Sequence, residues 1–316
     1  MTAISPYILL IAGFTVLIKG ADFFVEGSGS IAKKLRVPDI IVGLTIVAMG
    51  TSSPELAVSV SAALGGSSDI SVGNVVGSNL LNILIVLGIS AVLSPIIVDK
   101  SLFNRDFPML IVTAVILPLI AVTGGNRIGR LGGIVLIAIF IVYIMLTVRS
   151  ALQYRKEYPS SETEEITVMP WWQSIAFTVG GAAAVIISGQ ISVNAATDIA
   201  HQLGISEAII GLTVVALGTS LPELVTSAVA AKKGNSDMAL GNIVGSNIFN
   251  VLLILGTTAV IKPFPVSTES IIDQIAVLAV TILLIIFSKT GNKISRTEGI
   301  IFLFLYVIYA VYLFMR

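Results

Sequence analysis

The apolar residues of this chain form long runs separated by short polar breaks, and the pattern continues from one end to the other. A helix needs about 20 mostly apolar residues to cross a bilayer. The pattern therefore predicts an all-α membrane protein with ten transmembrane helices. The expected spans cover residues 6–31, 38–64, 71–93, 106–123, 128–149, 171–200, 206–231, 239–261, 271–288 and 298–315.

One segment near the middle breaks this pattern. Residues 151–170 carry a cluster of charges, which predicts a short aqueous linker. The linker divides the chain into a first five-helix repeat, residues 1–150, and a second, residues 171–316. The charged residues are Arg155, Lys156, Glu157, Glu162, Glu164 and Glu165.

The two sides of the linker repeat each other. A shift of 168 residues aligns 41–59 with 209–227 without a gap, and thirteen of these nineteen positions are identical. The same shift aligns GNVVGSNLLN, which begins at Gly73, with GNIVGSNIFN, which begins at Gly241. General apolar similarity would not reproduce the shared Gly, Pro, Glu, Asn and Ser residues, so we interpret the match as an internal duplication.

The number of spans in each half fixes how the halves are related. Because five is odd, the second half enters the membrane from the opposite side, and a pseudo-two-fold axis in the membrane plane relates the two repeats. Secondary transporters commonly have this inverted topology, with the binding site at the repeat interface near the midplane.

The distribution of positive charges predicts the orientation. With ten spans, loops on the linker side hold thirteen Lys and Arg residues and the opposite loops hold four. Positively charged loops favour the cytoplasm. We therefore expect a multi-pass protein of the cell membrane, with a cytoplasmic linker and both termini outside.

The composition supports this class of protein. Of the 316 residues, 55% are hydrophobic and only 11% are charged, whereas about a quarter of the residues of a soluble domain are charged. A formal net charge of zero gives no indication of a nucleic-acid partner. The absence of cysteine excludes disulfides and thiolate metal sites. The expected partners are the lipid bilayer and small inorganic cations, with no cofactor.

Two predicted spans contain a carboxylate deep within apolar sequence: Glu55 in GTSSPEL and Glu223 in GTSLPEL. A charge at this depth costs at least a few kcal/mol, so it is expected only beside a cavity, a partner or an ion. The inverted repeat brings both glutamates to equivalent depths near one axis, where they repel each other unless a cation or a proton lies between them. Oxygen ligands suit Na⁺ and Ca²⁺.

The neighbouring residues also offer oxygen ligands. Thr51, Glu55 and Ser59 recur every four residues, so they share one face of a helix. The second repeat has the same pattern. The remaining oxygen-bearing side chains of the two motifs are Ser52, Ser78, Asn82, Thr219, Ser220, Ser227, Ser246 and Asn250.

Pro54 and Pro222 add a backbone feature to the two motifs. A proline inside a helix leaves the carbonyl four residues earlier without its donor, and freed carbonyls in a broken span can coordinate cations. The alternative is a simple kink with a hydrogen bond between helices. Four further asparagines are more consistent with hydrogen bonds between helices than with ion binding: Asn74, Asn79, Asn242 and Asn247.

With its two copies of GTSxPE, each followed by GNxxGSNxxN, the chain resembles the cation/calcium exchanger superfamily and, within it, the prokaryotic sodium/calcium exchangers. The resemblance implies ten helices in two inverted repeats, with spans 1 and 6 as long tilted helices that slide past the motif helices. It also implies a set of ion ligands, including backbone oxygens at Ala48 and Ala216. These are Ala48, Thr51, Ser52, Glu55, Ser78, Asn82, Ala216, Thr219, Ser220, Glu223, Ser246 and Asn250.

The resemblance implies an antiporter that exchanges Na⁺ for Ca²⁺ by alternating access. Some prokaryotic relatives have Asp where this chain has Asn250, and so does the K⁺-dependent branch, so Asn250 argues against K⁺ dependence. Coupling to H⁺ is the first alternative and a cation channel is the second. An enzyme is not expected, because the sequence has no His/Asp or Ser/Lys arrangement and no metal-binding histidine cluster. We expect the chain to function as a monomer.

Overall fold

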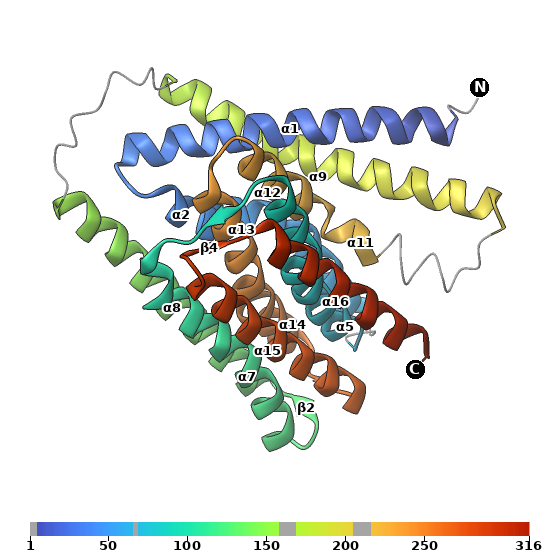
Figure 1. The fold of residues 1–316 in the computed structure, drawn as a ribbon. Coiled ribbons are helices and arrows are strands. Elements are labelled where there is room, and N and C mark those ends of the chain that lie inside the picture. The colour runs from blue at the N-terminus through green and yellow to red at the C-terminus, as the bar shows by residue number, and fades with distance from the viewer. Residues whose placement is uncertain (1–4, 66–68, 158–168, 205–215, 316) are drawn as a thin grey trace.

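The computed structural model describes residues 5–65, 69–157, 169–204 and 216–315, and this part of the chain is mostly helical (Figure 1). The elements of the first half are α1 (Pro6–Leu35), α2 (Asp39–Val42), the π-helix η1 (Gly43–Val47), α3 (Ala48–Thr51), α4 (Ser53–Gly65), α5 (Asp69–Leu81), the π-helix η2 (Asn82–Val86), α6 (Leu87–Leu93), β1 (Ile96–Ile97), the 3-10 helix η3 (Lys100–Phe103), α7 (Asp106–Thr123), β2 (Arg127–Ile128) and α8 (Arg130–Glu157).

The second half has a matching series of elements. They are α9 (Trp171–Gln202), α11 (Ala216–Thr219), α12 (Leu221–Lys232), α13 (Ser236–Phe249), the π-helix η5 (Asn250–Leu255), α14 (Gly256–Ile261), β3 (Phe264–Pro265), α15 (Thr268–Lys289), β4 (Lys293–Ile294) and α16 (Arg296–Met315).

Within the described residues, eight helical segments are long and apolar enough to cross a membrane. A ninth results if the bent pair Asp39–Thr51 and Ser53–Gly65 is one span. These nine segments coincide with nine of the ten predicted spans. The remaining prediction, 206–231, falls partly on residues outside the described ranges. Helix α8 extends to Glu157, so the first residues of the predicted linker continue a helix.

Side chains at the helix starts explain several of these boundaries. Asn235 accepts a hydrogen bond from the Met238 N–H and begins α13, and Ser267 begins α15 in the same way. Before α16, Ser295 and Glu298 form reciprocal side-chain to backbone bonds, a capping box that pairs two otherwise unpaired N–H groups.

Burial separates a central layer from an outer layer. In the most apolar stretch of Ser71–Leu93, 78% of the residues are buried, and in that of Ser236–Ile261 the share is 83%. The corresponding share is only 11% in α16 and 22% in α8 and α15. An outer layer that exposes so much apolar surface fits lipid as its solvent. The two spans that carry GNxxGSNxxN therefore form the core of the bundle.

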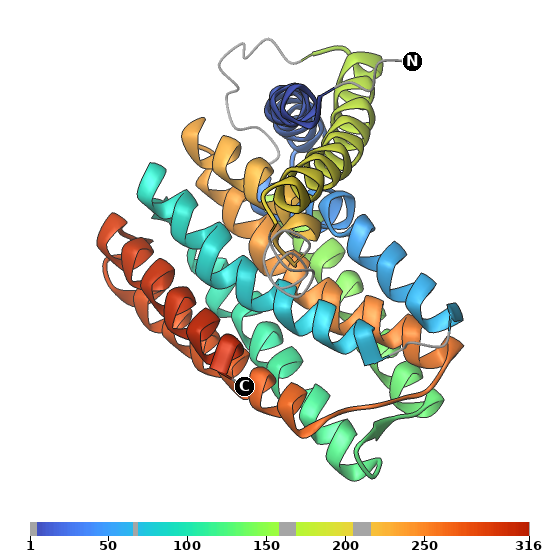
Figure 2. The ribbon, with the colours of Figure 1, turned by 90° about the vertical axis from the view of Figure 1, so that its right-hand side faces the viewer.

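Helices α1 and α9 form a separate pair on one side of the bundle, where they run obliquely to the other helices (Figures 1 and 2). Small residues allow the pair to approach closely. Gly20 and Gly27 of α1 lie against the backbone of α9 at Val185 and Thr178, and Gly181 of α9 lies against the backbone of α1. Ser30 and Ser174 add a buried hydrogen bond of 2.8 Å.

Two short antiparallel strand pairs join segments from the two halves. Strand β1 pairs with β4, with Ile96 opposite Ile294, and β2 pairs with β3, with Ile128 opposite Phe264. Figure 1 labels β4 and β2 at opposite ends of the bundle. Each pair therefore connects the first half to the second at one end of the helices.

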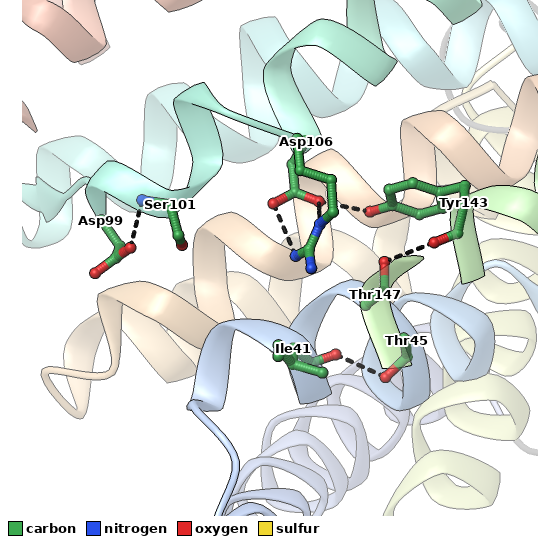
Figure 3. A network of polar contacts seen from close by, with 8 residues as sticks. Ile41, Thr45, Asp99, Ser101, Asp106, Tyr143 and Thr147 are labelled. Carbon is green, nitrogen blue, oxygen red and sulfur yellow. Dashed lines mark hydrogen bonds and ion pairs between the residues drawn. The ribbon is translucent and has the colours of Figure 1, made fainter. Parts of the chain in front are cut away.

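A buried polar network at the start of α7 joins this helix to α8 (Figure 3). Asp106, at the start of α7, is fully buried and accepts hydrogen bonds from Nε and Nη2 of Arg105 at 2.9 and 3.0 Å. The Tyr143 hydroxyl of α8 donates a third, 3.0 Å long, and Thr147 bonds the Tyr143 carbonyl. Because both carboxylate oxygens have donors, this buried charge is compensated locally.

We expect Gly181→Ala to destabilise the protein by about 1–3 kcal/mol, because the contact with α1 has no room for a methyl group. A Cβ there lies 2.5 Å from the Phe24 backbone nitrogen and 2.8 Å from the Gly20 carbonyl oxygen. The measurement is the melting temperature of the purified protein in detergent. The control is Gly180→Ala, since no described atom lies within 4 Å of that exposed position. Equal melting temperatures for the two variants would contradict the packing argument.

Candidate functional site

The centre of the bundle contains helices that are interrupted at the two GTSxPE motifs. The first break falls at Ser52, where the axis bends by 46° between α3 and α4, and Pro54 occupies the first turn of α4. The second falls at Ser220, and Pro222 lies in the first turn of α12. Proline has no N–H to donate, so the first turn of a new helix is where it fits best.

Within the described ranges, three π-helices lie in or beside the motifs, and the sequence pattern did not predict them. Two of them begin at Asn82 and Asn250, the last residues of the GNxxGSNxxN copies. Single π turns inside α-helices occur often at functional sites. One inserted residue shifts the phase of an amphipathic pattern, but the spans that contain Asn82 and Asn250 are buried on nearly all sides and have no clear apolar face, so their sequence carried no usable signal.

The two glutamates of the motifs lie close together in the interior. Glu55 of α4 and Glu223 of α12 are each only 1% exposed. They are near enough that the charge of Glu223 acts on the carboxyl group of Glu55. Two carboxylates at this depth repel each other strongly because little solvent screens them. The two glutamates are therefore neighbours in the interior.

The two glutamates have different surroundings. Glu223 Oε1 accepts a 2.9 Å hydrogen bond from Ser52 and a long one, 3.5 Å, from Ser246. Its Oε2 has no partner among the described residues. Thr219 lies beside Glu55, yet neither oxygen of Glu55 accepts a hydrogen bond within the described part of the chain. Buried carboxylate oxygens without donors are costly, so this arrangement favours a cation or a proton at Glu55.

A second polar layer consists of four asparagines where α5 and η2 meet α13 and η5. Asn79 and Asn247 each donate to the other's main-chain carbonyl, at 3.3 and 3.4 Å. Asn82 donates to Oδ1 of Asn247 at 3.1 Å, and Asn250 donates to Oδ1 of Asn79 at 3.0 Å. The prediction that Asn79 and Asn247 bond between helices is confirmed.

Asn74 and Asn242, which correspond to each other in the two halves, form hydrogen bonds to neighbouring helices. Asn74 donates to Ser59 at 3.2 Å, and Asn242 donates to Ser227 at 2.9 Å. Thr51 donates to Oδ1 of Asn242 at 3.0 Å. The two serines, which sequence spacing placed on the glutamate face, therefore bond a neighbouring helix.

The remaining predicted ligands also belong to these helices. Ser78 of α5 is 2% exposed, and Ser220 is 3% exposed with no hydrogen-bond partner for its hydroxyl among the described residues. The Ala48 carbonyl accepts the Ser52 N–H at 3.0 Å and also faces the Thr51 hydroxyl. Ala216 is the first residue of α11.

Several buried oxygens around the two glutamates lack a donor in the described part of the chain. They are both carboxylate oxygens of Glu55, Oε2 of Glu223, the Oδ1 atoms of Asn82 and Asn250, and the Ser220 hydroxyl. Buried polar atoms without partners are rare in native proteins. Carboxylate, amide and hydroxyl oxygens are the ligands that hard cations prefer. This donor set is chemically suited to Na⁺ or Ca²⁺.

An apolar cavity lies next to this set of oxygens. Its volume is about 270 Å³, and its walls come from α1, α5, η2, α9, α11 and α12. Ser220 and Gly218 line it at the GTSLPEL break, and Phe14 of α1 lines it on the side of the helix pair. The cavity thus borders both the oblique helix pair and the GTSLPEL break.

Comparison with known proteins assigns the chain to a family. The family model for "Sodium/calcium exchanger protein" matches residues 5–149 and 173–315. The chain is 39% identical to the protein CaxA of Alkalimonas amylolytica, over 97% of its own length and 98% of that protein. It is 33% identical to the sodium/calcium exchanger MaX1 of Methanosarcina acetivorans, with 98% of each chain covered.

A solved structure gives the same result. The sodium-calcium exchanger NCX_Mj, soaked with zero Na⁺ and Ca²⁺, matches with a TM-score of 0.82, 34% identity and 98% coverage of both chains. The same exchanger soaked with 2.5 mM Na⁺ and 1 mM Sr²⁺ also matches with a TM-score of 0.82. With both halves matched by the family model and a shared fold over almost its full length, this chain belongs to the sodium/calcium exchanger protein family.

Proposed function

We propose that the protein is a secondary active antiporter that exchanges Na⁺ for Ca²⁺ across the membrane by alternating access, with the ions bound around Glu55 and Glu223. The observation that carries the proposal is the buried carboxylate pair, whose oxygens mostly lack donors in the described part of the chain. Family membership and relatives named for sodium and calcium support the choice of ions. Two carboxylates together balance the charge of one Ca²⁺.

The proposed ligands surround these two carboxylates. Ser52 and Ser246 already bond Glu223, and Asn82 and Asn250 have amide oxygens without donors among the described residues. The Ala48 and Ala216 carbonyls complete the set as backbone ligands. The full proposed set is Ala48, Thr51, Ser52, Glu55, Ser78, Asn82, Ala216, Thr219, Ser220, Glu223, Ser246 and Asn250.

We also propose that the fold consists of ten transmembrane helices in two inverted repeats, residues 1–150 and 171–316, joined by a cytoplasmic linker at 151–170. Both termini lie outside, and the protein functions as a monomer. The reciprocal bonds of Asn79 and Asn247 support this symmetry, because the 168-residue shift exchanges the two residues. The strand pairs are related in the same way, since Ile96 of β1 corresponds to Phe264 of β3.

Alternating access requires a part of the molecule that moves. The α1–α9 pair fits this role because its two helices pack more extensively against each other than against any other element, and because it borders an apolar cavity with few polar groups to break. Binding of a cation removes the repulsion between Glu55 and Glu223, and an ion can favour movement only by binding one conformation more tightly than the other. Neutralising the carboxylate pair is thus the step that permits the helices to move.

Glu55→Gln and Glu223→Gln are each expected to reduce Na⁺-driven Ca²⁺ uptake into proteoliposomes to the level of empty liposomes, because each removes one of the two charges that balance Ca²⁺. The control is Glu26→Gln, which changes an exposed glutamate of α1 and is expected to leave uptake unchanged. The proposed site is wrong if either site variant transports at the wild-type rate.

The same assay separates the alternative functions. Uptake driven by a pH gradient in Na⁺-free buffer would identify H⁺ coupling, and uptake driven by a K⁺ gradient would identify K⁺ dependence. Ca²⁺ flux without any counter-ion would identify a channel.

Thermal stability provides a second test of the carboxylate pair. At a Ca²⁺ concentration about 100 times its Kd, binding stabilises the wild type by about 2.7 kcal/mol. Glu55→Gln is expected to lose this gain. In buffer without Na⁺ or Ca²⁺, the same variant is expected to melt at a higher temperature than the wild type, because the repulsion is gone. Equal Ca²⁺ stabilisation in both proteins contradicts the proposal.

The absence of cysteine allows a direct test of orientation. Lys156→Cys lies near the end of α8, within the proposed linker, and Lys262→Cys lies between α14 and β3. A membrane-impermeant maleimide added to intact cells is expected to label Lys262→Cys but not Lys156→Cys, since the positively charged linker side is cytoplasmic. The reverse labelling pattern refutes the proposed orientation.

A further inference from the structure

The four asparagines where α5 and η2 meet α13 and η5 have amide orientations that follow from two main-chain carbonyls. The nitrogen and oxygen of an Asn side chain have nearly the same shape, so only the bonding network distinguishes them. A main-chain carbonyl can only accept a hydrogen bond. Because the Asn79 side chain contacts the Asn247 carbonyl, and the Asn247 side chain contacts the Asn79 carbonyl, both must present their NH₂ groups there.

This first orientation determines a second one. With its NH₂ on a carbonyl, Asn79 turns its Oδ1 toward Asn250, and Asn247 turns its Oδ1 toward Asn82. An amide oxygen accepts but does not donate, so Asn82 and Asn250 must place their own NH₂ groups against it. The distances are 3.1 Å for Asn82 and 3.0 Å for Asn250.

The result is that the oxygens of Asn82 and Asn250 are left for another partner. Both side chains are buried, at 1% and 0% exposure, and neither Oδ1 has a donor within the described part of the chain. The two residues lie one turn after Ser78 and Ser246, and Ser246 bonds Glu223. A side-chain flip would instead place an NH₂ donor where the oxygen is, and a cation cannot bind a donor.

We propose that Asn79 and Asn247 are positioning residues that orient the amides of Asn82 and Asn250 across the interface between the two repeats. This inference rests on the proposed function, because it assigns the freed Oδ1 atoms to the transported cation. Each positioning residue acts on the opposite repeat: Asn79 on Asn250, and Asn247 on Asn82. Each half of the protein thereby completes the binding site of the other.

The test compares the effect of Asn79→Ala in the wild type with its effect in the Asn250→Asp background. The measured quantity is the Ca²⁺ Kd of the full-length protein in detergent, obtained by isothermal titration calorimetry. Asn79→Ala alone is expected to raise the Kd about 10- to 100-fold, the usual effect of losing a residue that orients a metal ligand. In the Asn250→Asp background, the same substitution is expected to change the Kd by no more than about twofold. A carboxylate has two oxygens and needs no orientation.

A mismatched background separates positioning from a general loss of packing. In Asn82→Asp, Asn79→Ala is expected to keep its full effect on the Kd, because Asn250 still has an amide to orient. A purely structural role for Asn79 predicts the same penalty in both backgrounds, and that result would overturn the proposal. The Na⁺-driven uptake assay is expected to give a raised KM for Ca²⁺ with a smaller change in kcat.

The reciprocal series covers the case in which Asn79→Ala does not fold. In this reciprocal series, Asn247→Ala is combined with Asn82→Asp as the matched background and with Asn250→Asp as the mismatched background. If the wild-type protein binds no Ca²⁺, both the proposed function and this inference fail. If the wild type binds and exchanges Ca²⁺ but the matched and mismatched penalties are equal, only the inference fails.

Discussion

The structure depends on the burial of two carboxylates in the interior of an apolar bundle. Glu55 and Glu223 are each 1% exposed and interact electrostatically, so solvent does not screen their repulsion. Around them the backbone is interrupted at Ser52 and Ser220, and the Ser52 and Ser246 hydroxyls donate to Glu223. A cation that binds there relieves the repulsion, which links ion binding to the stability of this part of the fold.

The polar groups around the carboxylates divide into two functions. One set holds the helices together: Asn74 and Asn242 bond serines of the neighbouring helices, and Asn79 and Asn247 bond carbonyls across the centre. The other set presents oxygens without donors among the described residues. Because the amides of the first set are used in packing, those of the second are held in one orientation. Packing and ligand geometry are therefore parts of the same network.

The outer layers follow a different rule. Few residues of α8, α15 and α16 are buried, as expected where lipid is the solvent, and glycines bring the α1–α9 pair close together. Buried polar groups occur here as well, as at Asp106, which is compensated by Arg105 and Tyr143. The Tyr143 hydrogen bond thus joins α8 to the start of α7, whereas the oblique pair combines close glycine contacts with the packing of Phe23 on Phe177.

The sequence by itself determined the membrane class, nine of the spans found in the described residues, the duplication, and the glutamates that lie together in the centre. These features depend on composition and local period, and a buried charge in an apolar run is visible without coordinates. Only the tertiary structure decided the π-helices at Asn82 and Asn250, the different surroundings of Glu55 and Glu223, and the direction of each asparagine amide. These depend on which atoms from distant segments meet, and a one-dimensional pattern does not encode the distance between a side chain and a carbonyl 168 residues away.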